Sequence, residues 1–418
     1  SYLKTFTIFL FLFTIVTSIS QNDIPNFEKY YKPKEFSNMD MFNGNSKYSW
    51  TRYKQSEHFF VFWESGFGND PSSASISQDL RVDINDLLSK AEKFYSTNIE
   101  KVKMATIGSN KSYLDKYKLQ IYLIYSKDWV ATGAGYDNVI GALWVTPSTC
   151  HPVGSVIAHE IGHTFQYQVY CDQILTGQTR ENEFKSGYRY GYEGSNGGNG
   201  FWEQTAQWQS FLDYPEEIFT CWEFEVQWLP NYHRHFENEY MRYGSYWLHY
   251  YWASKYGLEA IGKIWRNSKK PEDGISTYTR IFNNNNYEVT REELFDYAMK
   301  MATYDIDGIR EYSKQFQGKY TTKFYVDTQG YYQVAYNRCP GATGFNVVEL
   351  TIPSDYKEIQ VEFVGLKPGS NLANGDPGQF YNVFDEGFAG TVTHYNTVNK
   401  DNVGWRYGFV AHLKDDSR

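Results

Sequence analysis

The sequence predicts an α+β fold in which a strand-rich region is followed by a mainly helical region and then by an antiparallel β-sandwich. Alternating apolar residues, as in residues 118–126, are typical of strands. Apolar residues at i, i+3 and i+4 spacing, as in residues 79–95 and 290–306, are typical of amphipathic helices. From about residue 317, short strand-like runs are separated by Gly, Pro, Asn and Asp, which is typical of an antiparallel sandwich.

The first 20 residues have the pattern of a secretory signal peptide. Lys4 is their only charged residue, residues 6–16 form a short apolar run, and Ser18 and Ser20 provide small residues for cleavage. An apolar run this short does not span a bilayer, so we expect a secreted protein without a stable membrane span. The alternative is an N-terminal anchor.

The 418 residues exceed one ordinary domain, and the pattern divides them into three further parts. Residues 21–55 lack periodicity and are expected to be an irregular lead-in, residues 56–318 a mixed domain, and residues 319–418 the β-sandwich. Thr290 and Glu293 have the spacing of a capping box. Within the mixed domain we expect strands at 58–64, 118–126 and 139–147, and helices at 79–95, 238–257, 258–268, 271–282 and 290–306.

The motif His159-Glu160-Ile161-Gly162-His163 lies in a run with helical apolar spacing, and Pro152 is expected in the first turn of that helix. Residues four apart share a helical face, so both imidazoles can reach one ion. Glu160 would lie beside that ion, where a carboxylate can accept a proton from water. The alternative is an amphipathic helix whose histidines form hydrogen bonds in the core.

A second predicted helix follows a Gly-rich loop and has Glu203 in its first turn. A catalytic zinc ion requires three protein ligands and an open position, and two His with one Glu are such a set. We therefore predict Glu203 as the third ligand, the alternative being a carboxylate stabilised only by the helix dipole. Weaker candidates for the third ligand are Glu181, Glu183, Glu193 and Gln204.

With His159, Glu160, His163 and Glu203, the last in W-E-x-x-A, the chain resembles the gluzincin group of zinc metallopeptidases over about residues 56–320. The resemblance implies a zincin-like catalytic domain in which the two histidines and Glu203 bind zinc and Glu160 is the general base. It also implies that residues 139–147 are the substrate-binding edge strand. That group often has Asn or Asp next to the ligand glutamate, whereas this chain has Trp202 and Gln204, which puts the support of the ligands in doubt.

The wall of such a site usually provides a Tyr or His that forms a hydrogen bond with the oxyanion of the tetrahedral intermediate. Our first choice is Tyr243, and Tyr246 and His249 are alternatives. Residues 186–200 alternate Gly with Tyr and are either a flap over the cleft or a long connection. The pair of histidines in residues 233–235 has no further ligands nearby in sequence, and we expect it at the surface.

Four cysteines, Cys150, Cys171, Cys221 and Cys339, could form two disulfides in a secreted protein. A continuous helix of about 20 residues is roughly 30 Å long and would keep Cys150 and Cys171 apart. We favour Cys171–Cys221 with Cys150–Cys339. Cys150–Cys221 with Cys171–Cys339 and four free buried thiols remain open.

The net charge of −9 and the lack of a basic cluster argue against a nucleic-acid partner. A loop of Asn, Gly and Asp within residues 369–378 could hold Ca²⁺, although its spacing is not that of an EF-hand. Asn110-Lys111-Ser112 is a glycosylation sequon. The C-terminal domain could contact a glycan or a protein, or only support the catalytic part.

Together these features predict a secreted zinc metallopeptidase, most simply an endopeptidase, that acts on a protein or glycoprotein substrate. The alternative is a catalytically inactive zincin scaffold that binds a glycan or protein outside the cell as an adhesion protein. A purely structural zinc site would require a fourth protein ligand. The whole chain also resembles secreted microbial proteins that are grouped only as a domain of unknown function, which implies no activity.

Overall fold

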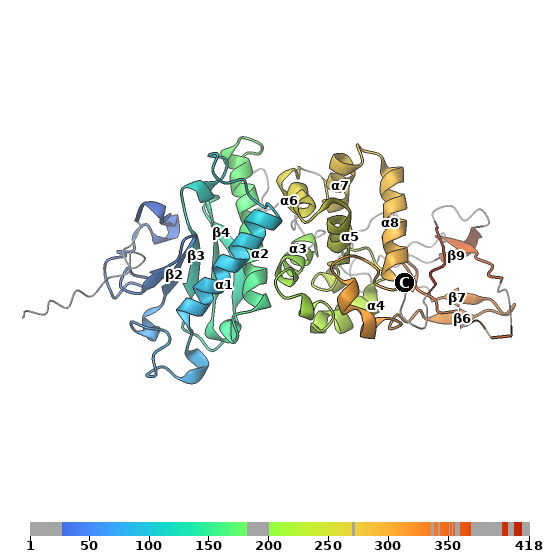
Figure 1. The fold of residues 1–418 in the computed structure, drawn as a ribbon, viewed down its shortest axis with the longest axis horizontal. Coiled ribbons are helices and arrows are strands. Elements are labelled where there is room, and N and C mark those ends of the chain that lie inside the picture. Colours follow the sequence, from blue (N-terminus) through green and yellow to red (C-terminus); the bar gives the residue numbers. More distant parts are fainter. Residues whose placement is uncertain are drawn as a thin grey trace, which may run out of the picture.

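The computed structural model describes residues 27–181, 200–269, 272–335, 338–341, 343–350, 352, 354–355, 360–368, 395–399 and 405–411. A mixed sheet with two long helices lies at one end of the elongated molecule, a group of helices lies in the middle, and short strands lie at the other end (Figure 1). This arrangement confirms the predicted α+β class.

The sheet has five strands in the order β1-β2-β3-β5-β4. The three inner strands are parallel to one another, and each outer strand is antiparallel to its neighbour. The strands predicted at 58–64 and 118–126 are confirmed as β2 and β3. The strands are β1 (Tyr53–Gln55), β2 (Phe59–Trp63), β3 (Leu119–Leu123), β4 (Ala131–Tyr136) and β5 (Ile140–Val145).

The prediction of the edge strand is wrong. The strand within residues 139–147 is β5, which lies inside the sheet between β3 and β4. The edge strand is β4, which a short loop joins to β5. Asp137 and Asn138 in that loop have φ of 55° and 59°, a left-handed conformation that suits a hairpin turn.

All residues of β2 and β3 are buried because both faces of the sheet are covered. On one face, Phe60 packs against Tyr30 and Trp50, with ring centroids 5.6 and 5.7 Å apart. On the other face, Phe59 packs against Tyr95, with centroids 6.0 Å apart. The described part of the predicted lead-in, residues 27–55, therefore forms a layer over the sheet, and its last residues supply strand β1.

Helix α1 (Ile84–Ser96) covers part of the second face. It begins five residues later than the predicted helix at 79–95, because the Asp83 side chain caps it by accepting hydrogen bonds from the amides of Asn85 and Asp86. The preceding residues Gln78–Leu80 form a 3₁₀ turn instead.

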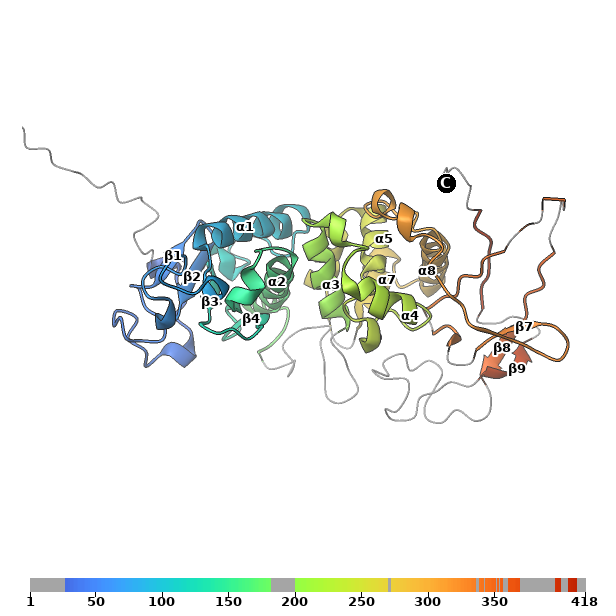
Figure 2. The ribbon, with the colours of Figure 1, turned by 90° about the horizontal axis from the view of Figure 1, so that it is seen from below.

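Helix α2 (Ser155–Leu175) contains the H-E-x-x-H motif and packs against β4 and β5 on one side. On its other side lies α3 (Gly200–Phe211), so that α2 separates the sheet from the helical group (Figure 2). Pro152 lies three residues before α2 and not in its first turn, as we had expected. Most of α2 is buried, which explains why its sequence is apolar or uncharged on nearly every side.

The helical group confirms the helices predicted at 258–268, 271–282 and 290–306. The helix predicted at 238–257 is α-helical only from Trp247, since Glu239–Met241 form a 3₁₀ turn. The predicted capping box is wrong because Asn286 caps α8, which places Thr290 and Glu293 inside that helix. These helices are α4 (Leu229–Asn231), α5 (Trp247–Tyr256), α6 (Glu259–Arg266), α7 (Gly274–Phe282) and α8 (Tyr287–Met301).

The described C-terminal residues form two antiparallel pairs of strands, β6 with β7 and β8 with β9. These pairs do not by themselves make a sandwich, which stays a prediction. Their bounds are Phe324–Val326, Tyr332–Val334, Gly365–Pro368 and Tyr395–Asn399.

Several predictions lie outside the described residues. They are the signal peptide at 1–20, the calcium loop at 369–378 and the flap at 186–200 up to residue 199. Among the helices that the structure describes, none has both the length and the apolar character needed to cross a membrane.

Candidate metal centre

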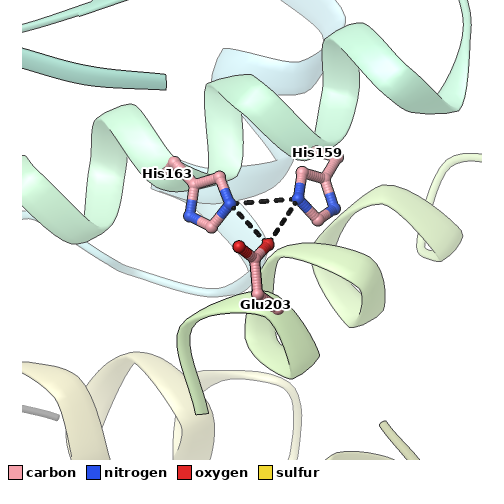
Figure 3. Close-up of side chains that lie close together, drawn as sticks. All are labelled: His159, His163 and Glu203. Carbon is pink, nitrogen blue, oxygen red and sulfur yellow. Dashed lines mark hydrogen bonds and ion pairs between the residues drawn. The ribbon is translucent and has the colours of Figure 1, made fainter. Parts of the chain in front are cut away.

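Helices α2 and α3 bring three predicted ligands together (Figure 3). The Nε2 atoms of His159 and His163 lie 3.0 Å apart, and each lies 3.0 Å from Oε2 of Glu203. The two histidines are one turn apart on α2, as their spacing of four predicts. Glu203 lies in the first turn of α3, where the helix dipole favours a carboxylate. These three residues could bind a metal ion.

The group is largely screened from water, which strengthens its electrostatics. The side chains of His159, His163 and Glu203 are 9%, 10% and 12% exposed. Burial alone would raise the pKa of Glu203, but the charge of His163 and hydrogen bonds from both rings hold it well below its usual range. Burial alone would lower the pKa of His163, but the Glu203 carboxylate outweighs it and raises that pKa to about 9. The site therefore favours positive charge between these atoms.

The spacing of these atoms suits zinc. A tetrahedral ion with ligands at about 2.0–2.1 Å separates adjacent ligand atoms by roughly 3.3 Å. The observed separations of 3.0 Å are only a few tenths of an ångström shorter, a difference that small side-chain rotations can supply. Two imidazole nitrogens with one carboxylate oxygen are also a donor set that zinc accepts.

Two glutamines contact the other nitrogen of each ring. Oε1 of Gln207 lies 2.8 Å from Nδ1 of His159, and Oε1 of Gln166 lies 3.0 Å from Nδ1 of His163. The sequence analysis missed both residues. Their spacing was the available signal, because Gln166 follows His163 by three residues and Gln207 follows Glu203 by four, which places each pair on one helical face.

Glu160 lies beside the group and is not part of it. Its Oε2 accepts a 2.6 Å hydrogen bond from the backbone amide of Gly133 in the edge strand β4. A Cβ atom at Gly133 would lie 2.0 Å from the carbonyl oxygen of Glu160, so only glycine allows this close approach of β4 to α2. The edge strand therefore holds the predicted general base in place.

Of the three candidates for the wall of the site, only Tyr243 contacts the metal group. Its ring centroid lies 5.9 Å from that of His159, and its phenol is near enough to Glu203 for that carboxylate to raise its pKa. Burial and the charge of Glu203 raise the pKa of Tyr243 above its usual value, so the phenol keeps its proton. Tyr246 instead donates to the carbonyl of Ile218, and His249 pairs with Thr205.

The weaker ligand candidates that the structure describes lie elsewhere. The amide of Gln204 donates to the carbonyl of Phe236, and Glu181 accepts a hydrogen bond from Asn138. Glu183 and Glu193 lie outside the described residues. Among the candidates that the structure describes, Glu203 is therefore the one that lies with the two histidines.

Two other predictions are corrected. His233 and His235 are 4% and 7% exposed, so they are buried rather than at the surface, because Gly341, Gly344 and Phe345 pack over this segment. All four cysteines are free, so neither predicted pair of disulfides forms. Cys221 contacts Tyr246 of the helical group, whereas Cys171 is fully buried in α2 near Tyr113 and Tyr167, which explains why the favoured pair does not meet.

Comparison with curated proteins and with solved structures gives no match. A family model described as "Family of unknown function (DUF6055)" matches residues 23–418, which is nearly the whole chain. The resemblance to a family without an assigned activity is thereby confirmed. The chain belongs to this family of unknown function, DUF6055.

Proposed function

We propose that this protein is a secreted zinc metallopeptidase of the gluzincin type, which hydrolyses peptide bonds. The observation that supports it most is the convergence of two imidazole nitrogens and a carboxylate oxygen, mutually 3.0 Å apart, beside a second carboxylate that is not a ligand. A structural zinc site requires four protein ligands. Among the described residues the group has three, which fits a catalytic site with one open position.

In this proposal His159, His163 and Glu203 hold the zinc ion. When bound there, zinc supplies Lewis-acid chemistry, which polarises the scissile carbonyl and makes water more acidic. The low pKa of Glu203 keeps it as a carboxylate and thus as a ligand at neutral pH. Its position on α3, away from the two histidines on α2, makes the site dependent on the packing of the two helices.

Glu160 and Tyr243 would perform the proton and hydrogen-bond steps. The Glu160 carboxylate accepts a proton from the attacking water and then passes it to the leaving amine, so that water is added across the C–N bond. Tyr243 keeps its phenolic proton because its pKa is raised, and it can therefore donate a hydrogen bond to the oxyanion.

The edge strand β4 suggests how a substrate would bind. β4 is the last strand of the sheet, so one of its sides has no strand partner among the described residues. An extended peptide can add to such an edge through backbone hydrogen bonds. The hydrogen bond from Gly133 to Glu160 would place the scissile bond of that peptide next to the general base. This mode suits an endopeptidase acting on a protein or glycoprotein, and glycan contact through residues 319–418 stays a prediction.

The test is cleavage of casein by the mature chain after loading with one equivalent of zinc. We expect cleavage that a chelator abolishes and that zinc restores. Glu160→Gln should retain zinc and lose cleavage, because it removes the base without removing a ligand. Glu217→Gln is the matched control, since Glu217 bonds with Ser155 at the start of α2 and is not part of the metal group. Cleavage by Glu160→Gln at the parent rate would refute this function.

A further inference from the structure

The side-chain amides of Gln166 and Gln207 have a defined orientation. Nε2 of Gln166 donates to the carbonyl of Trp202 at 3.0 Å, and Nε2 of Gln207 lies 3.5 Å from the carbonyl of Tyr243. A backbone carbonyl only accepts hydrogen bonds. The amide nitrogens therefore face these carbonyls, and the amide oxygens face the two histidines.

This orientation fixes the tautomer of both rings. An amide oxygen only accepts, so each imidazole must donate from Nδ1 to its glutamine. A neutral imidazole has one ring proton, which the glutamine keeps on Nδ1, so a cation that displaces the Nε2 proton of His159 or His163 meets a lone pair on that nitrogen. Both nitrogens are then ready to bind a cation, and no ring has to turn over first.

The two acceptors are side-chain amide oxygens, which carry no charge, whereas a carboxylate is one of the usual acceptors in this position. A carboxylate that accepts from a ligand histidine makes the ring more basic and its metal more tightly bound. An amide oxygen fixes the same geometry but withdraws less of the Nδ1 proton. A metal ion bound there would then receive less electron density from the two imidazoles.

We propose that Gln166 and Gln207 are positioning residues that hold both ligand imidazoles in the Nδ1–H form with uncharged acceptors, so that the metal ion is bound less tightly but stays more electrophilic than beside carboxylates. This inference rests on the proposed metal-dependent function. In this inference the two glutamine amides on α2 and α3 orient the ligands, a role that the side chains adjacent to Glu203 do not have. Gln204, the neighbour of Glu203, is turned away toward Phe236.

The experiment measures the zinc dissociation constant of the full chain by competition with a chelator, and the visible absorption of the Co²⁺-loaded chain. Gln207→Met removes the acceptor, and we expect it to bind zinc about 10–100-fold more weakly and to shift the Co²⁺ bands. Gln207→Glu keeps an acceptor of the same size and adds charge, and we expect it to bind zinc about tenfold more tightly than the parent. Gln207 is preferred to Gln166 because its amide nitrogen makes only a long contact, which limits the effect on folding.

Gln168→Met is the matched control for the loss of a buried amide. Gln168 lies on α2 two residues from Gln166, but it bonds with Gly141 and Asp172 and not with a ligand. We expect its zinc affinity and Co²⁺ bands to match those of the parent. Circular dichroism checks that each variant folds. If Gln207→Met does not fold, the zinc affinity of Gln207→Glu tests the inference.

The outcomes separate this inference from the proposed function. Parent-like zinc affinity in Gln207→Met, or binding no tighter in Gln207→Glu, would overturn the inference while leaving the peptidase proposal intact. A parent chain that binds zinc but cleaves no protein would overturn the peptidase proposal alone. A parent chain that binds no divalent metal would overturn both.

Discussion

Replacing Gly133 by Ala tests whether the contact between β4 and α2 sets the geometry of the site. A Cβ atom there would lie 2.0 Å from the carbonyl oxygen of Glu160 and 2.8 Å from Cβ of His163. Non-bonded carbon atoms are most stable about 3.5–4.0 Å from their neighbours. The strand and the helix must therefore move apart by roughly 1.5 Å at this point.

That displacement has two expected consequences. Inserting a methyl group into a packed contact typically costs about 1–3 kcal/mol in the free energy of unfolding. A shift of about 1 Å at catalytic groups can reduce the rate about 100-fold. Because the shift acts on the backbone between Glu160 and His163, we expect Gly133→Ala to reduce both zinc affinity and kcat/KM while the chain still folds.

The assay compares Gly133→Ala with Gly154→Ala by chemical unfolding, chelator competition and casein cleavage. Gly154 immediately precedes α2, and a Cβ atom there would have no neighbour closer than 3.8 Å. We expect the control to resemble the parent in all three measurements. If Gly133→Ala kept the zinc affinity and the cleavage rate of the parent within a factor of two, the role assigned to this contact would be wrong.

Three further predictions concern Asp172, Tyr243 and the four cysteines. Burial is the main cause that raises the pKa of Asp172 from 3.8 to about 7 in the folded state. The free energy of unfolding should therefore fall by on the order of 4 kcal/mol as pH rises from about 4 to 7. Asp172→Asn should remove this loss in unfolding curves, and an unchanged pH dependence would contradict the assignment. Tyr243→Phe should retain zinc and lose cleavage by roughly 100-fold or more, whereas Tyr246→Phe should reduce stability but leave the cleavage of the folded fraction unchanged, and equal effects of the two on cleavage would contradict the oxyanion role. The denatured, unreduced chain should react with four equivalents of a thiol reagent, because all four cysteines are free, and two equivalents or none would reveal a disulfide.

That His159, His163 and Glu203 come together could be predicted from the sequence because their chemistry and their helical spacing coincide. A spacing of four residues places His159 and His163 on one face of any helix, whatever the rest of the fold. Glu203 was harder to predict as a member of this group, because the helix dipole stabilises a carboxylate in a first turn without any metal. Glu203 reaches the two histidines only because α3 packs against α2, and no local sequence pattern specifies that packing.

The edge strand could not be predicted for a related reason. Residues 131–136 include two glycines and no alternating apolar pattern, so they have little strand propensity. Gly133 and Gly135 are needed because α2 packs so closely, with a Cβ at Gly135 only 2.2 Å from the ring of Tyr167. The glycines that weaken the local pattern are therefore those that bring the strand to Glu160.

The start of α1 and the layer over the sheet could not be predicted, for two different reasons. The start of α1 depends on the side chain of Asp83, and Asp79 offered an equally good cap in the sequence. The lead-in has no period because Tyr30 and Trp50 contact the sheet from turns rather than from regular elements. Periodicity detects helices and strands, and it does not detect a layer built from turns.

The most direct test of the metal centre is zinc K-edge X-ray absorption on the full chain loaded with one equivalent of zinc. The proposed site predicts two imidazole nitrogens, one carboxylate oxygen and one further light atom at about 2.0–2.2 Å, with no sulfur. Glu203→Gln should weaken binding enough that zinc is lost on dialysis. A first shell that contains sulfur at about 2.3 Å, or full zinc retention in that variant, would contradict the site formed by His159, His163 and Glu203.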